Sequence, residues 1–299
     1  MQLPKQFDPS SPAPVLIAGP TASGKSSLAL ELATHQPSII VNADALQVYK
    51  GWNILTARPS KADLMQTPHA LYGHVAMQTT YSVGHWLRDI QETLSKTPKR
   101  RPIIIGGTGL YFKALTRGLA DIPAIDASTR QAADDMAERT GLTAFAIRLL
   151  EQDPAAAARI DMNNPVRTRR AWEVFHQTGK SITWWQDQTP PPIFPKDNTQ
   201  TLLFEANTAW LKNRINRRFD RMVELGALEE ARKARDTFWD PRTPSSQAIG
   251  AAEFIDHLNG HTSLETAIER SKVRTHQFAK RQRTWFRSQM RGWNVVKLK

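Results

Sequence analysis

The chain has 299 residues, 40 of them basic and 28 acidic, and its formal net charge is +12. It contains no cysteine, which excludes disulfides, thiolate metal sites and a cysteine nucleophile. The composition is that of a globular protein, and no apolar run approaches the roughly 20 residues of a membrane helix or resembles a signal peptide. We therefore expect a cytoplasmic protein without membrane contact.

Short apolar runs alternate with helical segments in the first 120 residues. The first run, Val15–Ala18, precedes a glycine-containing turn and a helix expected over Ser26–Ala33. The second run, Ile39–Val41, ends at Asp44, and the third, Ile103–Ile105, ends in a glycine-rich segment. This alternation predicts an α/β fold with a parallel sheet flanked by helices. Ligands of such sheets bind beyond the carboxyl ends of the strands, so the segments that follow the strands are expected to converge.

The chain then becomes mostly helical and alanine-rich. One helix is expected to begin with Asn164 as N-cap and Pro165 at its first position, and to stop at Gly179. A proline-rich segment ends this region, and Thr201–Ala206 is expected to add a strand to the first sheet. We predict three parts: an α/β core at residues 1–120, an inserted helical domain at 121–190, and core completion with a basic helical part at 191–299.

Gly19–Ser26 reads G-P-T-A-S-G-K-S and matches G-x-x-x-x-G-K-[ST] between a predicted strand and a predicted helix. Glycines let backbone N–H groups turn toward phosphate oxygens, and the helix N-terminus adds positive potential. Lys25 supplies a full charge and Ser26 a hydroxyl for Mg²⁺. The motif predicts a phosphate or diphosphate site formed by Gly19, Pro20, Thr21, Ala22, Ser23, Gly24, Lys25 and Ser26.

Asp44 is the carboxylate best placed to act beside this site, because it ends the second predicted strand at the same sheet edge. It would serve as a general base or as a water-mediated Mg²⁺ contact, and the alternative is an N-cap of a following helix. The run Ile103–Ile105 lacks the terminal Asp with which ATPases help to hold Mg²⁺. A transferase that grips a polyphosphate leaving group therefore fits better than an energy-coupling ATPase.

Basic charge gathers at the C-terminal end. From Ala267 onward the chain has ten basic residues and one acidic residue. Aromatic side chains interleave these charges, which favours a nucleic-acid partner over a solvated basic tail. Lys280, Arg283 and Arg287 are spaced to share one face of a helix, whereas Trp285 is expected to pack in the core.

A series of motifs runs in order from about residue 15 to residue 290. They are the P-loop Gly19–Ser26, Asp44–Tyr49 (DALQVY), Thr56–Pro59 (TARP), Tyr81–Val83 (YSV), Ile105–Tyr111 (IGGTGLY), Arg159–Arg170 (RIDMNNPVRTRR) and Lys280–Arg287 (KRQRTWFR). Together they resemble the motifs of the tRNA dimethylallyltransferases, also called tRNA isopentenyltransferases. The resemblance implies a P-loop NTPase-like core.

The resemblance also implies a reaction. The family transfers a dimethylallyl group from dimethylallyl diphosphate to N6 of the adenosine at tRNA position 37, next to the anticodon. By resemblance Asp44 is the general base, Thr108 and Arg130 line the adenine and diphosphate site, and Mg²⁺ on Ser26 is the cofactor. The residues implied to bind the tRNA anticodon stem-loop are Asp44, Ala45, Leu46, Gln47, Thr108, Arg130, Arg167, Arg170, Gln247, Gly250, Lys280, Arg281, Arg283 and Arg287.

The chain departs from the family pattern in three places that bear on activity. Ala45 replaces the serine after the aspartate, and Leu55 stands where the family has glycine. Ala251 and Ala252 replace a tyrosine and an arginine, which removes an expected tRNA contact and predicts a changed affinity or substrate range. The P-loop, Asp44 and Thr108 all remain, so we expect an active enzyme.

Two other functions fit part of the sequence. A small-molecule or nucleotide kinase would use the same P-loop for ATP, but it does not explain the basic C-terminal third. A non-catalytic RNA-binding member of the family would explain the alanine substitutions. The zinc finger of some family members is excluded by the lack of cysteine, and we expect a monomer.

Overall fold

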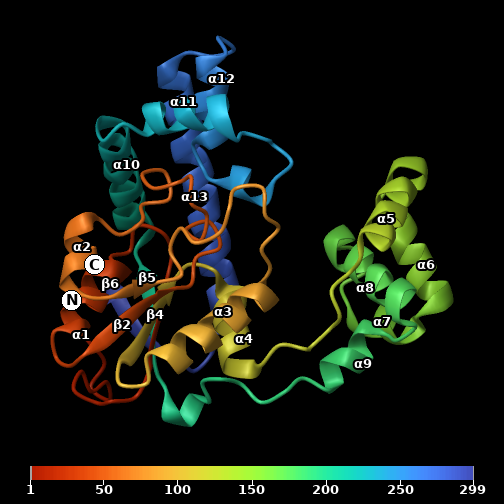
Figure 1. The fold of residues 1–299 in the computed structure, drawn as a ribbon, viewed down its shortest axis with the longest axis horizontal. Coiled ribbons are helices and arrows are strands. Elements are labelled where there is room, and N and C mark those ends of the chain that lie inside the picture. Colours follow the sequence, from red (N-terminus) through yellow and green to blue (C-terminus); the bar gives the residue numbers. More distant parts are fainter. Residues whose placement is uncertain (1, 299) are drawn as a thin grey trace. The chain divides into compact units, whose positions relative to one another are not determined.

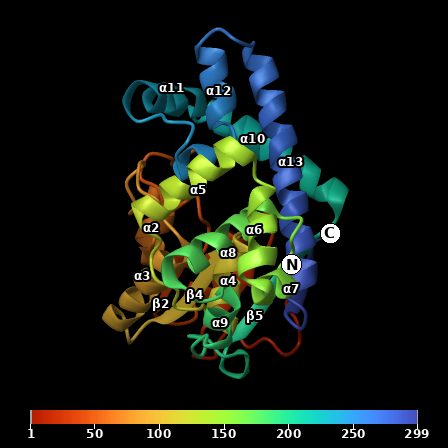
Figure 2. The ribbon, with the colours of Figure 1, turned by 90° about the vertical axis from the view of Figure 1, so that its right-hand side faces the viewer.

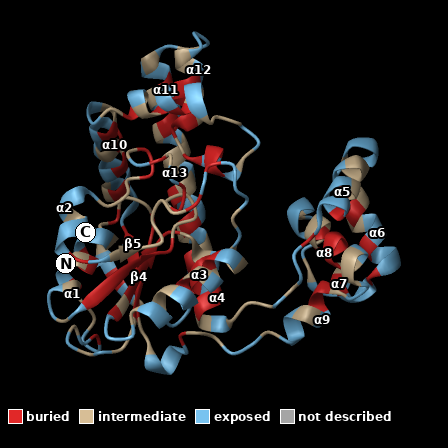
Figure 3. Cartoon of the chain, in the orientation of Figure 1, coloured by how far each residue is buried: buried red, intermediate tan, exposed pale blue. Residues whose placement is uncertain are grey.

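The computed structural model describes residues 2–298 and divides into two compact units (Figure 1). The first unit is built from two stretches of chain, Met1–Thr116 and Ile193–Lys299, and the second is Arg117–Pro192. The insertion predicted at residues 121–190 falls inside the second unit. Each unit has its own buried core, as the colouring by burial shows (Figure 3).

A six-stranded sheet forms the centre of the first unit, and its strand order is β3-β2-β4-β1-β5-β6. Every pairing between these strands is parallel, which confirms the predicted sheet class. The strands are β1 (Val15–Ala18), β2 (Ser38–Asn42), β3 (His69–Ala70), β4 (Arg101–Gly106), β5 (Gln200–Ala206) and β6 (Asn294–Leu298).

The register of the central strands brings the predicted site segments together. Strand β1 lies between β4 and β5, with Ala18 beside Gly106 and Leu203. Strand β2 ends with Asn42 beside Ile105 of β4. The loops after β1, β2 and β4 therefore all leave the sheet at the carboxyl ends of the strands, as expected for a parallel α/β sheet.

Helices cover both faces of this sheet because its strands alternate apolar side chains between the faces. Ile17 and Ile103 pack on one face with Leu28 of α1, while Leu16 and Ile104 pack on the other. The long helix α13 packs against α10 and α12 (Figures 1 and 2). The helices of the first unit are α1 (Lys25–Ala33), α2 (Lys61–Gln66), α3 (Val83–Lys96), α4 (Gly109–Arg117), α10 (Thr208–Glu224), α11 (Ala227–Thr237), α12 (Ala251–Leu258) and α13 (Leu264–Gln289), with 3₁₀ turns at Lys196–Asn198 and Pro244–Gln247.

The second unit is a helical bundle. Its helices are α5 (Ala127–Thr140), α6 (Ala144–Gln152), α7 (Pro154–Arg159), α8 (Pro165–Thr178) and α9 (Ile182–Asp187). Phe145 and Trp172 meet edge to face in its core. The Asn164 side chain accepts the Arg167 N–H at 3.2 Å, and α8 ends at Gly179 with φ 65°, so the predicted N-cap and stop are confirmed.

The last strand, β6, was not predicted from the sequence. It pairs with β5 at the sheet edge and buries Val296. Within residues 2–298, no helix is both long and apolar enough to cross a bilayer.

Candidate active site

The P-loop connects β1 to α1, and its backbone takes positive φ values at a small residue and at a glycine. Ala22 and Gly24 adopt left-handed conformations, with φ of 61° and 94°. The buried Ser23 hydroxyl has no hydrogen-bond partner among the described residues. The Lys25 ammonium donates to the carbonyl oxygens of Gly19 and Pro20, both at 2.9 Å. The loop thus carries an unpaired polar group and an ammonium that an anion can engage.

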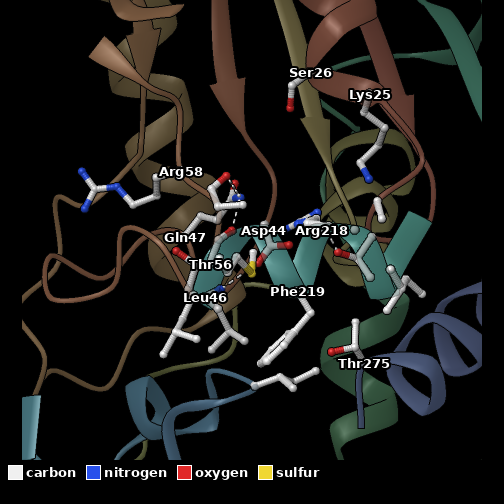
Figure 4. A pocket seen from close by; sticks show the side chains of 18 of the residues that line it. Lys25, Ser26, Asp44, Leu46, Gln47, Thr56, Arg58, Arg218, Phe219 and Thr275 are labelled. Atoms are coloured by element: carbon white, nitrogen blue, oxygen red, sulfur yellow. Dashed lines mark hydrogen bonds between the residues drawn. The ribbon is translucent and has the colours of Figure 1, made fainter. Parts of the chain in front are cut away.

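Burial in this loop lowers the pKa of Lys25 to about 7, although the nearby Asp44 carboxylate raises it and the Arg218 guanidinium lowers it further. Desolvation penalises the charged form of a lysine. An anion bound in the loop would restore the charge of the ammonium. Figure 4 shows Lys25, Asp44 and Arg218 around the same part of the cavity.

Asp44 is held in place by its neighbour Asn42, which is buried at the end of β2. The Asn42 side chain accepts the Asp44 N–H at 2.8 Å and donates to the Asp44 carbonyl at 2.9 Å. One Asp44 carboxylate oxygen accepts the Leu46 N–H at 3.0 Å, which caps a turn. The next helix begins only at Lys61, so the alternative of Asp44 as a helix N-cap is wrong.

The glycine-rich loop after β4 lies against the Asp44 loop. The Thr108 hydroxyl accepts the Ala45 N–H at 2.9 Å, and the Thr108 N–H donates to the Ala43 carbonyl at 3.2 Å. A Cβ on Gly106 would lie 2.0 Å from the Ala43 oxygen, so only glycine permits this approach. Thr108 and Asp44 are therefore neighbours, as the resemblance implies, and the contact to residue 45 uses its backbone and does not need the family's serine.

These loops and α10 surround a cavity of about 790 Å³ (Figure 4). Asp44 is the only acidic residue among its described lining. The basic residues in the lining are Lys25, Arg58, Arg214, Arg217, Arg218 and Arg221. Apolar side chains complete the wall, among them Leu46, Leu55, Phe219, Met222 and Ile249. The cavity thus combines a strongly cationic lining with an apolar surface and one carboxylate.

The arginines of α10 are site residues that the sequence reasoning missed. Arg214 donates to the Ala22 carbonyl at 2.8 Å, and Arg218 donates to the Thr21 hydroxyl at 3.1 Å. Burial lowers the pKa of Arg218, an effect that the Asp44 carboxylate opposes. The sequence did contain a sign of these residues, because the arginines recur at helical spacing beside the apolar stripe that runs from Leu211 to Met222.

Leu55, one of the departures from the family pattern, is buried in the wall of the cavity. Its side chain fills the space next to Gly250, where an ideal Cβ would lie 2.8 Å from the leucine Cδ2. The Glu230 carboxylate fixes the same loop by accepting the N–H groups of Asn53, Ile54 and Leu55 at 2.6 to 3.1 Å. Gly250 therefore has a packing role, with φ 98°.

Of the two glutamines that the resemblance implies to bind tRNA, only Gln47 lines the cavity. Its amide donates to the carbonyls of Thr56 and Ala57 at 2.7 and 3.1 Å. Gln247 is exposed at the end of a 3₁₀ turn before α12.

Arg130, Arg167 and Arg170 belong to the second unit. Arg130 on α5 and Arg167 on α8 are exposed, and Arg170 is partly exposed. Burial lowers the pKa of Arg170; Glu173 opposes this effect, and Arg130 adds to it. Arg130 and Arg170 therefore lie near each other on that unit, and Arg167 lies about one turn before Arg170 on α8.

The predicted stripe of Lys280, Arg283 and Arg287 lies on the helix α13, as expected. Lys280, Arg281 and Arg287 are exposed and Arg283 is partly exposed. Trp285 packs on the core and covers Gly109, where a Cβ would come within 2.1 Å of the indole ring. The expectation that Trp285 packs in the core is confirmed.

The residues present fit a Mg²⁺ ion that arrives with a diphosphate. No cluster of three carboxylate or imidazole side chains suited to a metal occurs within residues 2–298. Ser26, in the first turn of α1, lines the cavity with an exposed side chain. Mg²⁺ is commonly held by one or two protein groups together with substrate phosphates and water, which matches this arrangement.

Comparison with known proteins identifies relatives over nearly the whole chain. The family pattern described as "IPP transferase" matches residues 47–289, and the pattern "Isopentenyl transferase" matches residues 13–74. A tRNA dimethylallyltransferase of Ruegeria sp. (strain TM1040) is 53% identical over 95% of each chain. One of Dinoroseobacter shibae is 51% identical over 99% of this chain and 98% of that protein.

Solved structures agree with this relationship. A eukaryotic dimethylallyltransferase described as acting on tRNA superposes with a TM-score of 0.81 at 28% identity, covering 95% of this chain and 73% of that one. The tRNA isopentenylpyrophosphate transferase of Bacillus halodurans gives a TM-score of 0.65 at 32% identity, covering 96% and 90%. The chain is therefore a member of the tRNA dimethylallyltransferase family and has its P-loop NTPase-like fold.

Proposed function

We propose that this protein transfers the dimethylallyl group of dimethylallyl diphosphate to N6 of the adenosine at tRNA position 37, giving N6-isopentenyladenosine and diphosphate. One observation carries the proposal: the P-loop with Lys25 and the single carboxylate of Asp44 line the same cavity. A diphosphate leaving group and an amine nucleophile need these two kinds of group at a short distance from each other. The enzyme would act in the cytoplasm as a monomer.

The cationic lining assists departure of the leaving group. As the allylic C–O bond breaks, negative charge grows on the diphosphate. The P-loop backbone, Lys25 and Arg218 stabilise that charge without reorganisation, because the protein already holds them in place. The apolar wall with Phe219 and Met222 receives the dimethylallyl group and excludes water from the electrophilic carbon.

Asp44 accepts the proton. The adenine N6 is a weak base, so its N–H proton must leave as the new N–C bond forms. The carboxylate takes that proton and later passes it to solvent. Asn42 fixes the Asp44 backbone. The Thr108 hydroxyl accepts the Ala45 N–H, so it still has its own O–H to donate to the target adenine.

Mg²⁺ bound to the diphosphate would neutralise part of its charge, and Ser26 is the side chain that would hold it. The tRNA is held by the exposed basic side chains of α13, and by Arg130, Arg167 and Arg170 of the second unit. The target adenine must be turned out of its stack to reach an enclosed electrophile.

The decisive experiment is incubation with dimethylallyl diphosphate, Mg²⁺ and an unmodified anticodon stem-loop, followed by mass analysis of the nucleosides. We expect N6-isopentenyladenosine from the wild-type protein. Stem-loop binding without product would favour a non-catalytic RNA-binding protein. Neither product nor binding would favour a kinase.

A further inference from the structure

Gln282 is a polar residue on the buried stripe of α13. Ala279, Gln282 and Phe286 are all buried at helical spacing, and Gln282 is only 6% exposed. Apolar side chains occupy the other two positions. A buried amide is costly unless its polar atoms are hydrogen-bonded. The contacts of Gln282 therefore explain its presence.

The Gln282 amide bridges two loops of the site. Its oxygen accepts the Thr21 N–H of the P-loop at 2.9 Å, and its nitrogen donates to the Gly107 carbonyl at 3.0 Å. A Cβ on Gly107 would lie 2.1 Å from the same nitrogen, so the glycine loop approaches Gln282 as closely as glycine permits. Gln282 also lines the cavity. A single side chain thus ties the loop after β1 to the loop after β4.

The two loops carry the two halves of the reaction. The P-loop holds the leaving group, and the glycine loop positions Thr108, which contacts the Asp44 loop. A displacement of about 1 Å between reacting groups can slow a reaction about 100-fold. We propose that Gln282 is a positioning residue that fixes the distance between the diphosphate and the Asp44–Thr108 pair. This inference rests on the proposed function.

Two substitutions separate this role from simple packing. Gln282→Met keeps an unbranched side chain of similar length but removes both hydrogen bonds. Gln282→Glu keeps the acceptor for Thr21 but places a carboxylate oxygen against the Gly107 carbonyl. Gln277→Leu, on an exposed position of the same helix, is the matched control.

Single-turnover transfer is measured at saturating stem-loop and dimethylallyl diphosphate, with rates normalised to the stoichiometry of stem-loop binding so that unfolded molecules are not counted. For Gln282→Met we expect a rate at least tenfold slower, a stem-loop Kd within twofold of wild type, and an inorganic diphosphate Kd raised about three- to tenfold. Gln282→Glu should raise the diphosphate Kd further, because it adds negative charge beside the P-loop. The control should leave all three quantities unchanged.

The inference would be overturned if both Gln282 variants reacted at the wild-type rate. It would also be overturned if the transfer rate, the stem-loop affinity and the diphosphate affinity all fell together. Failure of the proposed function gives a different pattern, in which the wild-type protein makes no N6 product. In that case the diphosphate Kd still decides whether Gln282 organises the P-loop: an unchanged value in Gln282→Met would overturn that role.

Discussion

At the scale of single residues, the site depends on groups whose chemistry is changed by their surroundings. Lys25 lies among loop carbonyls in a cavity that holds several other cations, so its ammonium is less stable than in water. Asp44 faces these cations and is held by Asn42. The sequence shows which residues are present, but not the burial that shifts their pKa values.

The pKa of about 7 at Lys25 predicts a pH-dependent affinity for diphosphates. Below pH 7 the ammonium is charged and binds the anion, and above pH 7 the free loop loses that charge, so affinity should fall as pH rises from 6 to 8. The ligand itself gains charge over part of this range, so the wild-type protein is compared with Lys25→Met. Titration calorimetry should show the loss in the wild type alone.

The same shift has a consequence for stability. The folded-state pKa of Lys25 lies below the ordinary lysine value of 10.5, so the unfolded chain binds more protons between pH 7 and pH 10.5. The unfavourable contribution of Lys25 burial is full below pH 7 and declines as pH rises toward 10.5. The free energy of unfolding of the wild type should therefore rise between pH 7 and pH 10.5 relative to that of Lys25→Met. An equal pH dependence in the two proteins would contradict the assignment.

Asp44→Asn should bind both substrates and transfer about 100- to 10,000-fold more slowly, because the amide cannot accept the proton. Rapid-quench transfer assays give the rate, and stem-loop binding gives the control. Turnover close to wild type would remove Asp44 from its role as the base.

At the scale of elements, much of the fold follows from local patterns. The apolar runs at Val15 and Ile103, the P-loop and the Asn164 cap each specify their own structure, so the bounds of these elements were predicted to within two residues. Strand β6 was not, because its short run gains its stability from pairing with β5. The roles of Gln282 and the α10 arginines also depend on long-range contacts that no local pattern contains.

Helix α13 provides a prediction at this scale. Replacing Lys280, Arg283 and Arg287 together with alanine should weaken stem-loop binding and flatten its dependence on salt. Each lost phosphate contact removes about 0.7 to 0.9 from the log–log slope. Nitrocellulose filter binding from low to high salt measures that slope.

The control replaces the exposed lysines Lys61, Lys96 and Lys99, which removes the same net charge from other helices and loops of the first unit. A slope equal to that of the wild type in the α13 variant would show that the stripe does not contact phosphates.

At the scale of the whole molecule, the cavity beside the P-loop has the cationic and apolar lining that a ligand with an anionic head and a short apolar tail would need. A ligand that binds only the folded state stabilises it by about 2.7 kcal/mol at 100 times its Kd. We expect dimethylallyl diphosphate with Mg²⁺ to raise the unfolding temperature more than ATP with Mg²⁺ does. Differential scanning fluorimetry compares the two ligands at equal concentration, and stronger protection by ATP would favour the kinase.

The order of the strands has a consequence for the synthesis of the protein. The central strand β1 pairs with β5 as well as with β4, and the P-loop is tied by Gln282, so one strand partner and this side-chain tie are made late. While the chain is still being translated, the P-loop sequence exists without the contacts that shape it. A ribosome-bound chain that ends before α13 would thus lack a competent diphosphate site, so premature termination should yield inert fragments rather than proteins that sequester the prenyl donor.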